Sequence, residues 1–159
     1  MRPPLSRPFP VNPSDPQFTQ RVRDSFSRQG IMAHLGAVLT RIEPGFVEIE
    51  LPYRDELSQQ HGFFHAGAVA TIADSAGGYA AFTLFPAGSS VLTVEFKINL
   101  LAPADGGRIR ATGKVIKAGR TLTICELQAF ALKDGAEKLC AHGLGTLICL
   151  QGKSDSRPG

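Results

Sequence analysis

A single carboxylate inside a long apolar stretch constrains the fold of this chain more than any other feature. From Ala66 to Phe85 the only formally charged residue is Asp74, and the other residues are small, apolar or weakly polar. Such a stretch predicts a helix that is buried on all sides. An ionised carboxylate is costly to bury unless it is paired, and buried ionisable groups often mark functional sites. Asp74 is therefore the first candidate catalytic residue.

The same stretch has the length of a membrane span, about 30 Å of helix. However, Asp74 and the Gly77–Gly78 pair would then lie near the bilayer centre, and both flanks resemble strands of a globular domain. We therefore expect a buried helix and no membrane partner. The first residues contain no apolar segment of the kind that a secretory signal needs, so we expect a cytoplasmic protein.

The remaining chain predicts one α+β domain. Residues 1–16 hold six of the eleven prolines and are expected to form an N-terminal tail, residues 17–150 a single domain, and residues 151–159 a polar C-terminal tail. A short amphipathic helix is predicted from about residue 16 to 29, ended by Gly30. A β-hairpin turning at Pro44–Gly45 follows.

Long strands are predicted after the buried helix, at residues 91–101, 108–118, 121–132 and 139–150. In the first of them, strict alternation places the apolar residues on one face, opposite Thr93. Those apolar residues are Leu92, Val94, Phe96, Ile98 and Leu100. The order of elements predicts one antiparallel sheet that wraps a single central helix.

Composition and motif content indicate which classes of partner and cofactor to expect. Charged residues make up 19% of the chain, which favours extra buried surface such as a subunit interface, and the net charge of +3 is spread out, so we expect no nucleic acid. Three cysteines without a CxxC pair predict reduced core thiols. His61 and His65 lack a carboxylate partner in an HExxH pattern, so we expect no metal and no other cofactor.

A helical wheel gives the buried helix two unlike sides. Small residues lie within about 60° of Asp74, whereas larger side chains lie opposite. The small residues are Gly67, Ala70, Thr71, Gly77, Gly78 and Ala81; the larger ones are Val69, Ile72, Tyr79 and Thr83. We expect the larger side to face the sheet and the small side to admit a slender ligand. The alternative is that the small side packs on a partner helix.

The start of this helix supplies a second chemical element. Backbone N–H groups near His65, Ala66 and Gly67 lack partners within the helix and can bind an oxyanion. With a carboxylate, they suggest hydrolysis at an activated carbonyl, with Asp74 as general base or nucleophile. Ala66 and Asp74 are separated by about 12 Å along one helix, so a joint site requires two chains of a symmetric dimer.

The sequence resembles the hotdog-fold acyl-CoA thioesterases, in particular the phenylacetic-acid-degradation type. The resemblance rests on HGFFHAGAVATIADSAGG at residues 61–78, TVEFKINLLAPA at 93–104 and VIKAGRTL at 115–122. It implies a curved antiparallel sheet around one long helix, an acyl-CoA substrate, and a homodimer at minimum, often a homotetramer.

The resemblance also implies roles for individual residues. Asp74 matches the catalytic carboxylate, and Ala66 the residue whose N–H polarises the thioester carbonyl. Thr93 matches a hydroxyl near the attacking water, His65 the neighbour of the oxyanion position, and Gln59 a residue that holds the water or the carbonyl. Two of these depart from the family, which usually has Gly at the position of Ala66 and Asn at that of Gln59.

The residues that would bind the CoA end and the acyl end of the substrate are less clearly indicated by the sequence. Lys117, Gly119 and Arg120 match a turn that lies near the nucleotide in the family, and Gly67 is expected to contact substrate at the helix start. Five phenylalanine or tyrosine residues between residues 63 and 85 suit an aromatic or medium-chain acyl group, or else form core.

Two other functions stay open. A hotdog hydratase or dehydratase needs a histidine five residues after the aspartate, where this chain has Tyr79. A non-catalytic acyl-CoA-binding or regulatory module would keep the pocket without needing Asp74 or Thr93.

Overall fold

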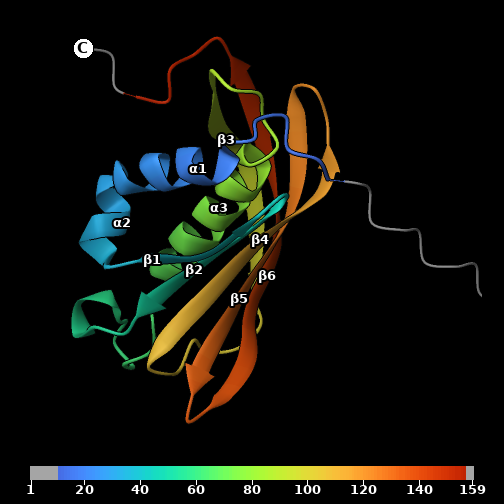
Figure 1. The fold of residues 1–159 in the computed structure, drawn as a ribbon. Helices are drawn as coiled ribbons and strands as arrows, with labels where there is room; N and C mark the ends of the chain where they lie inside the picture. Colours follow the sequence, from blue (N-terminus) through green and yellow to red (C-terminus); the bar gives the residue numbers. More distant parts are fainter. Residues whose placement is uncertain (1–10, 157–159) are drawn as a thin grey trace, which may run out of the picture.

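The computed structural model describes residues 11–156, so most of the predicted N-terminal tail and the end of the C-terminal tail lie outside the described residues. Six strands form one antiparallel sheet in the order β1-β2-β4-β5-β6-β3. They are β1 (Val38–Glu43), β2 (Phe46–Pro52), β3 (Ser89–Leu100), β4 (Arg108–Ala118), β5 (Leu122–Lys133) and β6 (Ala136–Gln151). The helices are α1 (Phe18–Ser27), α2 (Gly30–Leu35) and α3 (Ala66–Phe82). The curved sheet wraps α3, which is the predicted hotdog fold (Figure 1).

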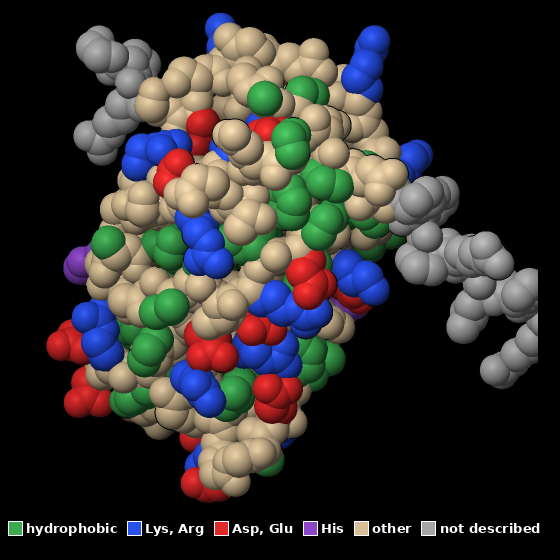
Figure 2. Space-filling model, viewed as in Figure 1, with side chains coloured by type: hydrophobic (Ala, Val, Ile, Leu, Met, Phe, Trp, Pro, Cys, Tyr) green, Lys and Arg blue, Asp and Glu red, His purple; other side chains and the backbone are tan. Residues whose placement is uncertain are grey.

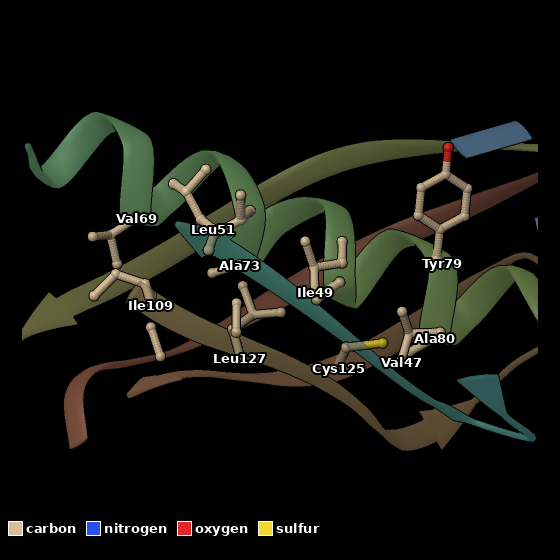
Figure 3. Close-up of a cluster of buried hydrophobic side chains, with 14 of the residues drawn as sticks. Val47, Ile49, Leu51, Val69, Ala73, Tyr79, Ala80, Ile109, Cys125 and Leu127 are labelled. Atoms are coloured by element: carbon tan, nitrogen blue, oxygen red, sulfur yellow. The ribbon is translucent and has the colours of Figure 1, made fainter. Parts of the chain in front are cut away.

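The core lies between α3 and the concave face of the sheet. Val69 and Ala73 of α3 meet Ile49, Ile109 and Leu127 from three neighbouring strands (Figure 3). At Gly113 of β4 the contact is between backbones, because a Cβ there would lie 2.2 Å from the Ala76 carbonyl oxygen. The helix therefore rests directly on the sheet, and apolar burial at this contact is the main stabilising term.

Two details of the predicted central helix are wrong. It ends at Phe82 rather than Phe85, and its small side does not stay free of the sheet, since Gly77 and Ala81 are buried. A Cβ on Gly77 would lie 2.4 Å from a Leu127 methyl group, so this glycine packs against β5. The curved sheet also reaches the side of the helix that carries Gly77 and Ala81, which a helical wheel cannot reveal. Only the part of the small side around Asp74 remains half-buried.

Arg21 of α1 closes the C-terminal end of α3. Its guanidinium donates hydrogen bonds to the carbonyl oxygens of Phe82 (2.9 Å), Phe85 (2.7 Å) and Pro86 (2.6 Å), and it stacks on the Phe82 ring. A cation at this position satisfies carbonyls that have no partner in the helix and complements its dipole. The N-terminal helix is thereby anchored to α3.

The segment after α1 also differs from the prediction. Gly30 does not end the helical region but begins α2, and Gly36, with φ of 74°, ends it in the left-handed conformation that glycine favours. Met32 and Leu35 are the buried residues of α2. A helix of six residues is too short to show the periodicity on which helix prediction relies, so the sequence pattern does not separate this segment from the hairpin.

A β-bulge at Val94 breaks the predicted alternation in β3. Thr93 pairs with Leu147 of β6, but the next pair is Glu95 with Thr146, so Val94 has no partner. Thr93 therefore shares the concave face with Phe96, although strict alternation placed them on opposite faces. The strand lies at the edge of the sheet, next to β6 alone.

The opposite side of the sheet is charged. Arg110 pairs with Glu48 (3.1 Å) and Glu137 (2.6 Å), and Arg108 with Glu50 (3.2 Å). Basic and acidic side chains lie next to one another over the lower half of the view in Figure 2. These two arginines are thus committed to carboxylates within the chain.

The cysteines lie in the core, as the sequence predicts. All three cysteines are buried and unpaired, and burial raises the pKa of the Cys125 thiol to about 12. Within residues 11–156, no helix combines the length and the apolar character that crossing a membrane requires.

Candidate active site

Asp74 lies half-buried on α3, facing β3. Its Oδ1 accepts a hydrogen bond from Thr93 Oγ1 at 2.8 Å. The β3 bulge makes this bond possible, because it brings the Thr93 side chain to the concave face. Burial raises the pKa of the Asp74 carboxyl above its usual value, and the bond from Thr93 offsets part of that rise.

A pocket of about 190 Å³ opens beside this carboxylate. Its walls come from α3, the start of β3 and the junction of α1 and α2; besides Asp74 and Thr93 the lining residues are Gln29, Ser75, Gly78, Tyr79, Val91 and Leu92. The Tyr79 and Ser25 hydroxyls lie 3.1 Å apart, so a buried hydrogen bond joins α3 to α1 here. Sequence reasoning missed Gln29, because nothing in its neighbourhood connects it to Asp74.

The start of α3 forms the other part of the site. His65 is the N-cap, and its Nδ1 accepts a hydrogen bond from the Gly67 N–H at 2.8 Å. The neutral ring therefore carries its proton on Nε2. Ala66, as the first residue of the helix, has no intrahelical partner for its N–H. Within the described residues no other hydrogen bond from that N–H is found.

A wider pocket of about 610 Å³ lies at this helix start. Its lining is mostly apolar and includes Phe63, Val69 and Leu100, together with Gln59 and His65. The Gln59 Oε1 accepts a hydrogen bond from the His61 N–H, which closes the turn before the helix. The amide NH₂ of Gln59 is the part of this side chain left to face a ligand.

The two groups of residues are separate in one chain. The structure brings Asp74 and Thr93 together, and it brings Gln59, His65 and Ala66 together, but the two pockets share no lining residue. Eight residues separate Ala66 from Asp74, which is about 12 Å along α3. Each chain therefore holds two candidate half-sites: the start of α3, and the carboxylate in its middle.

Gly119 and Arg120 lie apart from both half-sites, at the exposed turn between β4 and β5, and Lys117 lies next to them near the end of β4. A row of paired residues runs across the sheet from Thr93 through Leu147 and Thr123 to Ala118, next to this turn. At the usual strand spacing the row spans about 14 Å. The turn thus lies at the same end of the sheet as the carboxylate half-site.

Residues 61–138 match the thioesterase superfamily. A thioesterase family protein from Silicibacter pomeroyi, known from its crystal structure, is 51% identical and superposes with a TM-score of 0.84, covering 85% of this chain and 99% of that one. This chain belongs to the thioesterase superfamily.

Other members are more distant from this thioesterase. The proofreading thioesterase EntH of Klebsiella pneumoniae is 27% identical over 132 residues, which is 83% of this chain and 95% of that protein. The PaaI protein from the phenylacetic acid degradation operon of E. coli shares the fold, with a TM-score of 0.76 at 19% identity and with 86% of this chain and 95% of that chain covered.

The half-sites of this thioesterase have complementary chemistry. One offers a fixed backbone donor in an apolar pocket, which suits an oxygen that gains negative charge. The other offers a carboxylate whose pKa is raised, which makes it a stronger base than an exposed aspartate. Among the described residues no group of three or more His, Cys, Asp or Glu side chains is placed to hold a metal ion.

Proposed function

We propose that this member of the superfamily is an acyl-CoA thioesterase that hydrolyses aromatic or medium-chain acyl-CoA. The observation that carries the proposal is the half-buried Asp74 carboxylate, held by Thr93 at the mouth of a pocket on the concave side of the sheet. A carboxylate that serves only the fold would be expected to find a cation or several backbone donors. The one side-chain hydrogen bond found for Asp74 within the described residues comes from Thr93.

In this proposal Asp74 acts as general base or as nucleophile. As a base, it takes a proton from water while the water oxygen attacks the thioester carbon, and the C–S bond then breaks to release CoA thiol and the carboxylic acid. As a nucleophile, its oxygen attacks the thioester carbon and the C–S bond breaks to release CoA as thiolate. Water then hydrolyses the resulting anhydride to free acid and the Asp74 carboxylate, and the proton released converts the thiolate to CoA thiol. Thr93 orients the carboxylate in both cases.

The Ala66 N–H donates to the carbonyl oxygen as it becomes negative. His65 supports this donor, because its ring occupies the neighbouring Gly67 N–H and fixes the first turn of α3. Gly67 has no side chain to obstruct the approach of the substrate, and the Gln59 amide lies in the same pocket to hold the water or the carbonyl.

The active site forms between two chains. The edge strand β3 exposes apolar side chains on both sides of its bulge that a second copy can cover: Leu92 (58% exposed), Val94 (55%), Phe96 (43%) and Leu100 (57%). A symmetric dimer joined at this edge places the α3 start of one chain opposite Asp74 of the other. We propose a homodimer at minimum, with a homotetramer as the assembled form.

Lys117 and Arg120 bind the phosphates of CoA in this proposal. Both are exposed, and no side-chain partner is found for either within the described residues. Gly119 shapes their turn, because a Cβ there would lie 2.4 Å from the Leu122 carbonyl oxygen. Basic side chains at a free turn suit phosphate groups.

A thiol-release assay over aryl, short-chain and long-chain acyl-CoA tests the proposal, with isothermal titration calorimetry alongside. Turnover that disappears in Asp74→Asn while binding remains supports it. Binding without thiol release from the wild-type protein would instead indicate a non-catalytic acyl-CoA-binding module. The hydratase alternative is disfavoured by Tyr79, which is 2% exposed and bonded to Ser25 rather than facing the carboxylate.

A further inference from the structure

The two walls of the Asp74 pocket come from segments that are distant in sequence, and each wall is bonded to α3. One wall is Gln29, which follows α1, and the other is Val91 and Leu92 at the start of β3. Because β3 is an edge strand, β6 is its only neighbour in the sheet. Gln29 is bonded to Ser75 of α3, and Thr93 of β3 to Asp74, but within the described residues no hydrogen bond joins Gln29 directly to Val91 or Leu92. A further link between these two walls would therefore limit how far they can separate.

The chain after β6 makes that connection. Gly152, with φ of 69°, turns the backbone at the end of β6, and its N–H donates to the Gly88 carbonyl oxygen at 3.0 Å. The C-terminal segment then runs back over the N-terminal helices at the top of the view in Figure 1. This return brings Asp155 to the gap between α1 and β3.

Asp155 contacts both walls with one carboxylate. Its Oδ2 accepts from Arg28 Nη2 at 2.8 Å, and its Oδ1 accepts from Ser90 Oγ at 3.0 Å. Its backbone carbonyl oxygen accepts a further bond from Arg28 Nη2 at 3.1 Å. Each partner is directly adjacent in sequence to a pocket-lining residue, since Arg28 precedes Gln29 and Ser90 precedes Val91.

We propose that residues 152–156 form a clamp in which Asp155 fixes the distance between the two pocket walls and thereby limits the size of the acyl group. Asp155 is a positioning residue that acts through Arg28 and Ser90. This inference rests on the proposed thioesterase function. With the clamp closed, a pocket of about 190 Å³ has room for one aromatic ring or for the shorter of the medium-chain acyl groups, since a cavity of about 150 Å³ binds benzene.

The energetics favour a role in selectivity over one in folding. Arg28 is about half exposed, with 48% of its side-chain surface accessible, and a half-exposed ion pair contributes little to global stability. Loss of the clamp should therefore leave the domain folded and allow the walls to separate. Longer acyl groups would then enter, while short ones would bind as before.

The test compares kcat/KM for butyryl-CoA and decanoyl-CoA in Asp155→Asn, Arg28→Gln and the double variant. We expect each single variant to raise the decanoyl-to-butyryl ratio by roughly tenfold, because a few methylenes in a pocket discriminate by about that factor. The double variant should have nearly the same decanoyl-to-butyryl ratio as each single variant, because the two single changes remove the same contact. Asp155→Glu keeps the carboxylate, so its decanoyl-to-butyryl ratio should lie closer to the wild-type value than that of Asp155→Asn.

Asp134→Asn is the matched control, because it removes the same charge at the exposed turn between β5 and β6, at the other end of the sheet. Its acyl selectivity should equal that of the wild type. Equal losses for both substrates in the clamp variants, or an unchanged ratio, would overturn the clamp. Absence of any thiol release from the wild-type protein would instead refute the proposed function.

Discussion

The two half-sites on α3 are built in different ways. The start of the helix is a local structure: His65 caps the helix with its own ring, the turn before it is closed by Gln59, and the free Ala66 N–H follows from helix geometry alone. The carboxylate half-site depends on distant segments, since Asp74 needs a bulged edge strand on one side and the α1–α2 junction on the other. Local backbone geometry builds the donor of the first half-site, although distant residues such as Leu100 line its pocket, and tertiary register builds the second half-site.

This difference predicts how each half-site responds to change. The local half-site should lose only the function of the group removed, because its neighbours hold their positions without it. The carboxylate half-site should transmit changes made in β3 or in the C-terminal segment. Substitutions in the two half-sites therefore test whether one is built locally and the other through distant contacts. The largest effect is expected at Asp74.

Asp74→Asn should lower kcat for acyl-CoA hydrolysis by roughly 10²–10⁴-fold, the usual contribution of a general base. Because folding raises the pKa of Asp74, the ionised carboxylate costs folding free energy at pH values above the folded pKa. This cost shrinks as the pH falls below the folded pKa and is gone below the unfolded pKa. The variant should therefore melt at the same or a slightly higher temperature than the wild type at pH 7. Near-wild-type turnover would remove Asp74 from the mechanism.

Ala66→Pro should lower kcat by roughly 10²–10³-fold, the usual cost of one oxyanion donor. Proline lacks the N–H but fits the first helical position, and His65, with ψ of 138°, already has the conformation that a residue before proline prefers. The circular dichroism spectrum should be unchanged. Ala66→Gly keeps the N–H and is the control, so an equal loss in that variant would contradict the assignment.

Thr93→Val should lower kcat by about tenfold at neutral pH, because it removes a hydrogen bond to a charged group. Since the Thr93 bond lowers the pKa of Asp74, its loss should raise that pKa further and move the acid limb of the kcat profile to higher pH. Thr93→Ser retains a hydroxyl and should keep the wild-type profile. A drop in kcat without movement of the limb would mean that Thr93 acts on something other than Asp74.

His65→Ala should cost about 1 kcal/mol of unfolding free energy in urea, the usual value of a helix cap. His65→Asn should retain most of that stability, because Asn also caps helices. If His65 only supports the Ala66 donor, His65→Asn should keep most of the activity as well. Loss of activity without loss of stability in His65→Asn would indicate that the imidazole itself contacts substrate.

The same contrast separates the features that could be predicted from the sequence from those that could not: local features could be predicted, and those that depend on distant contacts could not. The helix start and the odd charge at Asp74 are local signals, and the residues alone are enough to predict both as candidate half-sites. The bulge at Val94 could not be foreseen, because the alternation in residues 91–101 looks regular and only pairing with β6 reveals the slip. The same holds for Gln29 and Asp155, which reach the pocket through contacts between distant parts of the chain.

The fold itself was predictable in outline because apolar periodicity marks each long strand. Two features were not predicted. The helix α2 has only six residues, too few to show a periodicity, and the side of α3 that faces the sheet depends on how far the sheet curves. Glycines at positions 77 and 113 allow the close approach of helix and sheet, but sequence alone presents them as flexible positions.

The central claim is that each active site takes its carboxylate from one chain and its oxyanion donor from another. The direct test is to coexpress Asp74→Asn and Ala66→Pro subunits with different tags and to purify the mixed dimer through both. If the sites are shared, one of the two sites regains both wild-type groups, and the mixed dimer should show about half of the wild-type thiol release. If each chain carries its own complete site, every site remains defective, and the mixed dimer should be no more active than the two parent variants.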